Sequence, residues 1–438
     1  MSLISSPPAP QAHSYGRSPR GGQAPRDAAV DLVRAACLVA VVAVHALMVG
    51  VSVQGGGAVL ENALEPWGGF TVFSWFAQMM PLFFVAGGFA SATHFRRERG
   101  RGVTGPGYVA SRLVRLLPIP LLAAVATALV LASLTLFRVD PGIVETAGWR
   151  ISQPLWFLGV YVLCSALVPA MLRLHERAPR LTLALLGAAM LLVDAARFAT
   201  GIDAVGFANL LFVWLFVQQL GFWLADGSVP RARIAVAALA GGAVWIAAGA
   251  SPANLFEALN PPTAVLACLG VVQLALFAAL RPQLERIAKL PAVSRAAAAI
   301  NARSMTIYSW HMPATVLLAG ALLAATQALG GELAVPLSGA WWLSRPAWFA
   351  AVALVVCFVV AAAGRLERPV LARLRATARP TPVRAAVAAL TGAAGVLVIL
   401  AATGTLAAWL GGAALIACAL MLCRAQPQNA NATPSSTP

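Results

Sequence analysis

Long apolar runs separated by short polar segments make up most of the chain. Each run approaches the ~20 residues with which an α-helix crosses a bilayer. The pattern predicts an all-α, polytopic membrane helix bundle. Its ten core transmembrane helices are expected at 28–52, 70–93, 113–137, 154–172, 181–198, 207–225, 234–250, 263–280, 305–329 and 347–364.

A further apolar run, 385–423, is too long for one span. As a single helix it would reach nearly 60 Å at ~1.5 Å per residue, against a hydrocarbon core of ~30 Å. A hairpin that turns near Thr403–Thr405 gives twelve spans in total, whereas one tilted helix gives eleven. We favour the hairpin.

These patterns divide the chain into five segments. A transmembrane domain at 28–369 follows a disordered cytoplasmic tail at 1–27, which is rich in Pro, Ser, Gly and Arg. A basic cytoplasmic loop at 370–384 leads to the C-terminal transmembrane segment at 385–423, and 424–438 is a second disordered tail. No apolar segment in the first tail resembles a cleaved signal peptide.

The basic residues alternate from one loop to the next. Of 31 Lys and Arg residues, only Arg138, Arg150, Arg197 and Arg345 fall in the loops opposite the N-terminus. By the positive-inside rule, the N-terminus is cytoplasmic and the protein is a multi-pass protein of the inner or plasma membrane. His94 and His175, beside arginines in the basic loops, are expected to be solvated, and Glu367 to pair with a neighbouring Arg.

Composition narrows the classes of function that the protein can have. The chain is 60% hydrophobic and 11% charged, with a mean hydropathy of +0.80, whereas soluble domains carry about 25% charged residues. Its net charge of +16 fits membrane topology and anionic lipid head groups better than nucleic acid. The six cysteines lack CxxC spacing and the five histidines lack HxxxH or HExxH pairs, so no metal site is expected.

Two polar residues interrupt the first apolar run, Arg34 and His45. Eleven helical steps return to within roughly 20° of the start, so both lie on one face, roughly 16 Å apart along the axis. An ionisable side chain inside a membrane is by default a functional candidate. The alternative is a structural histidine bonded to a neighbouring helix, with Arg34 as an interfacial anchor; this run alone does not decide between them.

Other polar positions accompany this pair. His311 lies in I-Y-S-W-H-M-P, roughly 12 Å into the ninth span, and by itself fits a packed structural histidine better than a catalyst. Arg112 and Arg115 share one helix face at the start of the third span, where they either anchor the helix or bind phosphate. Trp156 and Tyr161 occupy positions typical of interfacial aromatic residues.

Several motifs, taken in order, resemble those of the acyltransferase 3 family of integral membrane acyltransferases. Arg34 with His45 resembles the family's first-span signature, an Arg followed by ten residues and then a His. M-P-L-F-F-V-A-G-G-F resembles its Phe-rich Ser-Gly-Phe segment, and S-R-L-V-R-L-L-P its third-span entry. P-L-W-F-L, N-P-P-T and I-Y-S-W-H-M-P are similar to later segments. The resemblance covers about 28–369, without an appended extracytoplasmic hydrolase-like domain.

The resemblance implies transfer of an acyl group, usually acetyl, from cytoplasmic acyl-CoA to a hydroxyl of a carbohydrate, lipid or secondary-metabolite acceptor. It implies no permanently bound cofactor, with acyl-CoA as co-substrate. His45 matches the essential histidine, as base or acyl carrier, while Arg34, Arg112 and Arg115 match the arginines expected to hold CoA phosphates. His311, Tyr308 and Trp156 are expected around this site. Gly87 replaces the family's frequent Ser, which excludes a serine acyl carrier there.

A function of another class is a proton-coupled small-molecule transporter, because buried His and Arg also mark ion and substrate pathways. Few acidic residues lie in the spans, Asp194 being the main one. The sequence also shows no clear inverted repeat or paired broken helices. A scaffold without catalysis would leave the Arg34–His45 pairing unexplained.

Overall fold

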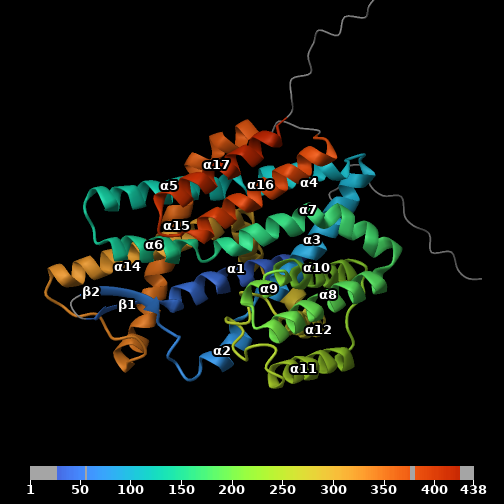
Figure 1. The fold of residues 1–438 in the computed structure, drawn as a ribbon, viewed down its shortest axis with the longest axis horizontal. Coiled ribbons are helices and arrows are strands. Elements are labelled where there is room, and N and C mark those ends of the chain that lie inside the picture. Colours follow the sequence, from blue (N-terminus) through green and yellow to red (C-terminus); the bar gives the residue numbers. More distant parts are fainter. Residues whose placement is uncertain (1–26, 55–56, 375–379, 425–438) are drawn as a thin grey trace, which may run out of the picture.

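A computed structural model of the chain describes residues 27–54, 57–374 and 380–424. The two predicted tails therefore lie almost wholly outside the described residues. The described chain folds into helices, with one two-stranded antiparallel hairpin (Figure 1). The elements are α1 (Ala28–Met48), β1 (Val49–Gln54), β2 (Gly57–Asn62), α2 (Phe70–Ala77), α3 (Met80–Gly100), α4 (Gly105–Leu116), α5 (Pro118–Leu136), α6 (Pro141–Ser152), α7 (Leu155–Arg177), α8 (Pro179–Thr200), α9 (Asp203–Gly206), α10 (Asn209–Ala225), α11 (Ala232–Ala247), α12 (Ala264–Ala288), α13 (Pro291–Ala302), α14 (Ser304–Ala328), α15 (Gly339–Leu374), α16 (Pro382–Ala401) and α17 (Leu406–Leu422).

The predicted fold class is confirmed. Within the described ranges, ten helical segments are long and apolar enough to cross a membrane, and α11 and α17 are shorter apolar helices. The C-terminal run forms the favoured hairpin, since α16 ends at Ala401 and α17 begins at Leu406. The result is an all-α polytopic bundle.

Some predicted boundaries are wrong, and proline accounts for several of the differences. A break at Gln78–Met79 precedes Pro81, and another at Gln153–Pro154 separates α6 from α7. Proline fits the first turn of a helix but cannot donate a backbone hydrogen bond within one. Pro81 predicts a kink in the second span, and the predicted fourth span begins at Pro154; the sequence pattern missed α6, which precedes it. The last core helix, α15, extends through Pro369 to Leu374, beyond the predicted domain end.

The first span also ends earlier than predicted. α1 stops at Met48 and the chain continues as β1, so His45 lies in the last turn of α1 and not about midway along its span. The N–H of Val49 still donates to the carbonyl of His45, which closes the helix. The two histidine-bearing helices therefore meet near this end of α1.

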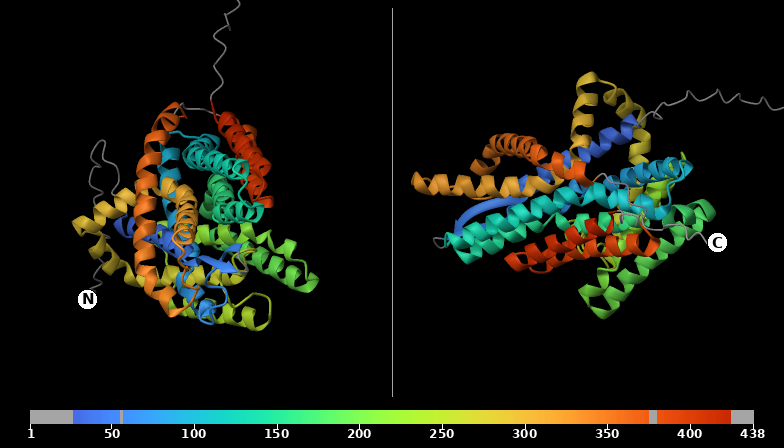
Figure 2. Two further views of the ribbon diagram at one scale, coloured as in Figure 1. Left: turned by 90° about the vertical axis from the view of Figure 1, so that its left-hand side faces the viewer. Right: turned by 90° about the horizontal axis from the view of Figure 1, so that it is seen from above.

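α1 runs through the middle of the bundle, where it contacts α3, α12, α13, α14 and α15 (Figures 1 and 2). Glycines allow the closest helix contacts, as expected for helix packing in membranes. A Cβ atom at Gly221 of α10 would lie 2.2 Å from the carbonyl oxygen of Val85, and one at Gly88 of α3 would lie 2.3 Å from that of Gln218. The α3–α10 pair therefore packs backbone against backbone.

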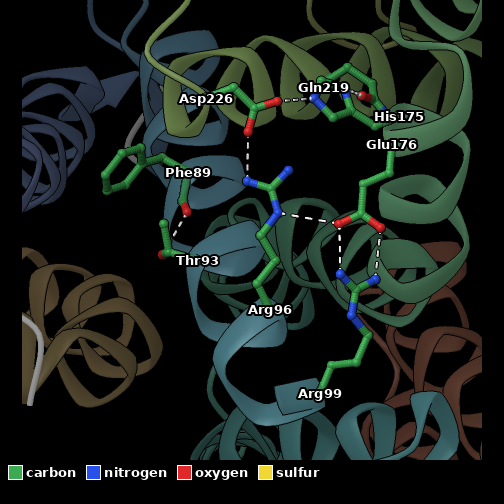
Figure 3. Close-up of polar contacts among 8 residues, drawn as sticks. All are labelled: Phe89, Thr93, Arg96, Arg99, His175, Glu176, Gln219 and Asp226. Atoms are coloured by element: carbon green, nitrogen blue, oxygen red, sulfur yellow. Dashed lines mark hydrogen bonds and ion pairs between the residues drawn. The ribbon is translucent and has the colours of Figure 1, made fainter. Parts of the chain in front are cut away.

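An ionic network joins α3, α7 and α10 at one end of the bundle (Figure 3). Arg96 donates to Asp226 at 2.6 Å, and Arg99 forms two 2.8 Å bonds with Glu176. Most of the described arginines lie at this end of the bundle, where α1 begins and α3 and α7 end. We call it the basic end, and we call the side that carries β1 and β2 the opposite end.

The expectation that His175 is solvated is wrong. Its side chain is 2% exposed, with Nδ1 2.9 Å from Oε1 of Gln219 and Nε2 2.9 Å from Asp226 (Figure 3). Neighbouring arginines in the sequence suggested exposure, but α10 covers this face of α7. His175 therefore helps to hold the two helices together.

Candidate functional site

A cavity of about 1100 Å³ passes through the bundle between its two ends. At the basic end it is lined by Arg34 of α1, Arg112 and Arg115 of α4, and Asn301 and Ser304 near the start of α14. Toward the opposite end its walls include Gln78 and Gln153 at the two helix breaks, Asn260 and Thr403. Charged side chains therefore line one end of the cavity, and amide and apolar side chains line the other.

His45 lines this cavity and contacts His311, 266 positions along the chain. Nδ1 of His45 lies 3.1 Å from Nε2 of His311, and Nδ1 of His311 lies 2.7 Å from the carbonyl oxygen of Tyr308. His311 is fully buried, whereas His45 is partly accessible. The two rings thus form a chain of polar contacts that begins at a backbone carbonyl and ends in the cavity.

This geometry fixes the tautomers of a neutral pair. The carbonyl of Tyr308 only accepts, so Nδ1 of His311 carries its proton and Nε2 is the acceptor. Nδ1–H of His45 then donates to that nitrogen, which leaves a lone pair on Nε2 of His45. The free lone pair of a neutral imidazole is the atom that takes a proton or attacks a carbonyl.

Three helices hold the histidine pair in place. The hydroxyl of Tyr308 donates to the carbonyl of Pro154 at 2.7 Å, which ties α14 to the α6–α7 break. The indole N–H of Trp348, on α15, donates to the carbonyl of Ala46 at 2.8 Å, next to His45. His45 is therefore fixed through the next residue in the sequence, and His311 through a residue one helical turn earlier.

Glu367 also positions α14, which corrects the expected ion pair with an arginine. Its carboxylate is 3% exposed and accepts from the hydroxyl of Thr306 at 2.7 Å and the indole N–H of Trp310 at 3.1 Å. These donors lie four residues apart, on one face of α14. The carboxylate therefore links α15 to the turn that carries His311.

The arginines at the basic end can bind an anion. Arg34 has a long 3.8 Å ion pair with Asp31, and Nη2 of Arg112 lies 3.5 Å from the hydroxyl of Tyr161. Nε of Arg34 and of Arg112 has no hydrogen-bond partner among the residues described. Guanidinium groups with unused donors match the geometry of phosphate oxygens.

The structure brings the predicted site residues together. Arg34, His45, Arg112, Arg115, Tyr308 and Trp156 all line the cavity, and His311 bonds to His45 behind it. Trp156 faces into the bundle, where its ring centroid lies 6.0 Å from that of the buried Trp214. In the described ranges, no three His, Cys, Asp or Glu residues group as metal ligands.

Sequence reasoning missed several residues of the cavity wall. Gln78 donates to the carbonyl of Leu255 and accepts from the backbone N–H of Met80, so it stabilises the α2–α3 break. It is the only amide in an otherwise apolar stretch, a signal that was available. No local pattern indicated the contribution of α16, because it depends on contacts far apart in the sequence.

Asp194, the main acid considered for a transporter, has a structural role. It accepts from Asn209 at 2.7 Å, from the indole of Trp245 at 2.9 Å and from the backbone N–H of Ala264 at 2.8 Å. It is 1% exposed and is not among the cavity-lining residues. The carboxylate therefore joins α8, α10 and α11 to the start of α12.

Comparison with known proteins assigns the family. The sequence model of an acyltransferase domain, that of the acyltransferase 3 family, matches residues 27–364 of 438. The chain belongs to the acyltransferase 3 family. Neither the curated proteins nor the solved structures compared with this chain contain a match. The matched region contains both histidines and all three cavity arginines, and it ends before α16 and α17.

Proposed function

We propose that this membrane acyltransferase transfers an acyl group from acyl-CoA to a hydroxyl of a carbohydrate, lipid or secondary-metabolite acceptor. One observation carries the proposal: the His45–His311 pair borders a single cavity whose basic end holds three arginines. Such an arrangement lets the two substrates approach the same imidazole from opposite directions. No permanently bound cofactor is required.

The donor binds at the basic end. Arg34, Arg112 and Arg115 contact phosphate groups of CoA, and the pantetheine arm extends along the cavity toward His45. Arg34 and His45 lie eleven positions apart on α1, roughly 16 Å at the α-helical rise. That separation suits an extended carrier whose thioester must reach the histidine.

His45 acts as the general base in this proposal. Nε2 takes the proton of the acceptor hydroxyl while the hydroxyl oxygen attacks the thioester carbonyl carbon. The tetrahedral intermediate then collapses, the C–S bond breaks, and the CoA thiolate takes the proton back from Nε2. His311 accepts a hydrogen bond from Nδ1–H throughout, which holds the ring and stabilises the transient imidazolium.

The acceptor enters from the opposite end, where Gln153 and Asn260 offer amide groups to hydroxyls. The charge distribution supports a cytoplasmic basic end and N-terminus, since the positive-inside rule places short basic loops in the cytoplasm. CoA would then be drawn from the cytoplasm. We accordingly place the protein in the inner or plasma membrane, in contact with lipid.

Labelled acetyl-CoA and purified protein test the proposal. Wild type should release CoA and transfer label to candidate hydroxyl acceptors, and His45→Ala should lose both activities. His94→Ala is the matched control, because His94 lies on α3 and does not line the cavity. Full activity in His45→Ala would refute the base, and label bound covalently to wild type but not to His45→Ala would indicate an acyl carrier instead.

A further inference from the structure

The C-terminal hairpin forms one wall of the cavity, although it lies outside the region matched by the family. Ala393, Leu397, Leu400 and Ala401 of α16 line the cavity along one face, and Thr403 of the turn lines its far end. The family match ends at residue 364. This wall is therefore a feature of this chain in addition to the acyltransferase domain.

The hairpin is held firmly against the rest of the bundle. A Cβ at Gly395 would lie 2.7 Å from the carbonyl oxygen of Gly412, so α16 and α17 pack backbone to backbone. At the turn, a Cβ at Gly148 of α6 would lie 2.4 Å from the carbonyl oxygen of Thr403. A wall fixed at both places has a defined position.

Two contacts set the depth of this wall. A Cβ at Gly159 of α7 would lie 3.5 Å from a side-chain carbon of Val396, and a Cβ at Gly148 of α6 would lie against the carbonyl of Thr403. α16 thus runs antiparallel to α6 and α7, and residues 397–401 lie level with the break at Pro154. Pro154 accepts the hydrogen bond from Tyr308, whose own carbonyl accepts from His311. The apolar face of α16 therefore lies at the depth of the histidine pair.

We propose that Leu397, Leu400 and Ala401 hold the hydrocarbon chain of the donor acyl group, so that the protein binds acyl groups longer than acetyl. The inference rests on the proposed function, which places the thioester at His45 and CoA at the basic end. Leu and Ala side chains offer no hydrogen bond to an acceptor hydroxyl, whereas they favour methylene groups. The amide groups of Gln153 and Asn260 remain for the acceptor.

Equilibrium binding of acetyl-, butyryl- and hexanoyl-CoA to the purified protein, measured by calorimetry, tests this inference. The affinity of wild type for the thioester should rise by up to about fourfold with each added methylene, because burying one CH₂ contributes ~0.8 kcal/mol. Leu397 is 55% exposed, so Leu397→Trp can be accommodated without disturbing the core. It should weaken hexanoyl-CoA binding at least tenfold and leave acetyl-CoA binding unchanged.

Leu390→Trp is the matched control. Leu390 lies two helical turns nearer the basic end on the same face of α16, is 63% exposed and does not line the cavity. Leu390→Trp should retain the wild-type rise in affinity from acetyl- to hexanoyl-CoA. Leu397→Ser, which removes apolar surface without adding bulk, should also flatten the series and serves if the Trp variant does not fold.

Each alternative result has one meaning. Equal affinity of wild type for all three thioesters, or a series unchanged in Leu397→Trp and Leu397→Ser, would overturn the chain-binding wall. Equal weakening of acetyl-CoA in Leu397→Trp would also overturn it, since Leu397 would then face the CoA moiety. Failure to bind CoA or any thioester would instead refute the proposed function.

Discussion

Replacing His311 tests the histidine pair most directly. His311→Ala removes the acceptor of Nδ1–H on His45 and the donor to the carbonyl of Tyr308, contacts of 3.1 and 2.7 Å. His45 would keep its place on α1 but lose the partner that fixes its tautomer. We expect kcat for acyl transfer to fall about 100-fold, within the 10²–10⁴ range for general bases, or about 2.7 kcal/mol.

The same change should leave donor binding intact. Arg34, Arg112 and Arg115 line the basic end of the cavity, away from His311, so KM for acyl-CoA should stay within twofold of wild type. Stability should fall by about 1–3 kcal/mol, because the Nδ1–H of His45 loses its acceptor. Initial rates with labelled acetyl-CoA at varied concentration give kcat and KM, and thermal unfolding gives the stability loss.

His311→Gln separates positioning from simple packing. A glutamine amide can accept from Nδ1–H of His45 through Oε1 and donate to the carbonyl of Tyr308 through its N–H groups. It should restore kcat to within about tenfold of wild type. Equal loss in the Gln and Ala variants, or unchanged kcat in a folded Ala variant, would refute the positioning role of His311.

Four further changes test other parts of the molecule. Arg34→Ala should raise KM for acyl-CoA about tenfold with kcat unchanged, and Arg34→Lys should recover part of this loss; a change in kcat alone in steady-state rates would contradict phosphate binding. Glu367→Gln, which retains one carbonyl acceptor, should destabilise the protein by about 1–3 kcal/mol in thermal unfolding, and an unchanged melting temperature would contradict its link to α14. Gly221→Ala, whose Cβ would meet the Val85 carbonyl at 2.2 Å, should abolish folded protein in size-exclusion chromatography, whereas Gly241→Ala, with open space around it, should be neutral or stabilising. Burial acts to raise the pKa of Asp226, but hydrogen bonds from Arg96 and His175 outweigh it and lower this pKa. The carboxylate therefore stabilises the folded protein fully above about pH 4, and this stabilisation is lost as pH falls through the pKa of Asp226 in the folded state. In melting temperatures measured across pH, Asp226→Asn should lack this loss of stability at low pH.

Features that depend on local spacing could be predicted from the sequence. The number of apolar runs, the hairpin turn and the shared face of Arg34 and His45 follow from helix geometry and from the thickness of a bilayer. The family resemblance then placed Arg112, Arg115 and His311 near the same site. The cavity is lined by both pairs, Arg34 with His45 and Arg112 with Arg115.

Features that depend on distant contacts could not be predicted. His175 lies among arginines in the sequence, yet its burial is set by Gln219 and Asp226 on α10 and at its end. Glu367 is flanked by Arg368, but its partners are neutral groups on α14. In both cases the charged residues nearby in the sequence predicted an ion pair or exposure to solvent. The actual partners depend instead on which other helix packs against the face that carries the side chain.

The helix breaks connect these long-range contacts to the site. Pro154 lies at the break before α7, and its carbonyl accepts both the backbone N–H of Phe157 and the hydroxyl of Tyr308. Tyr308 in turn offers its own carbonyl to His311. The proline that interrupts this span therefore provides the first link of a chain that ends at Nε2 of His45. Because α16 packs against the same part of α7, the wall of the cavity and the orientation of the imidazole are set from one place in the fold.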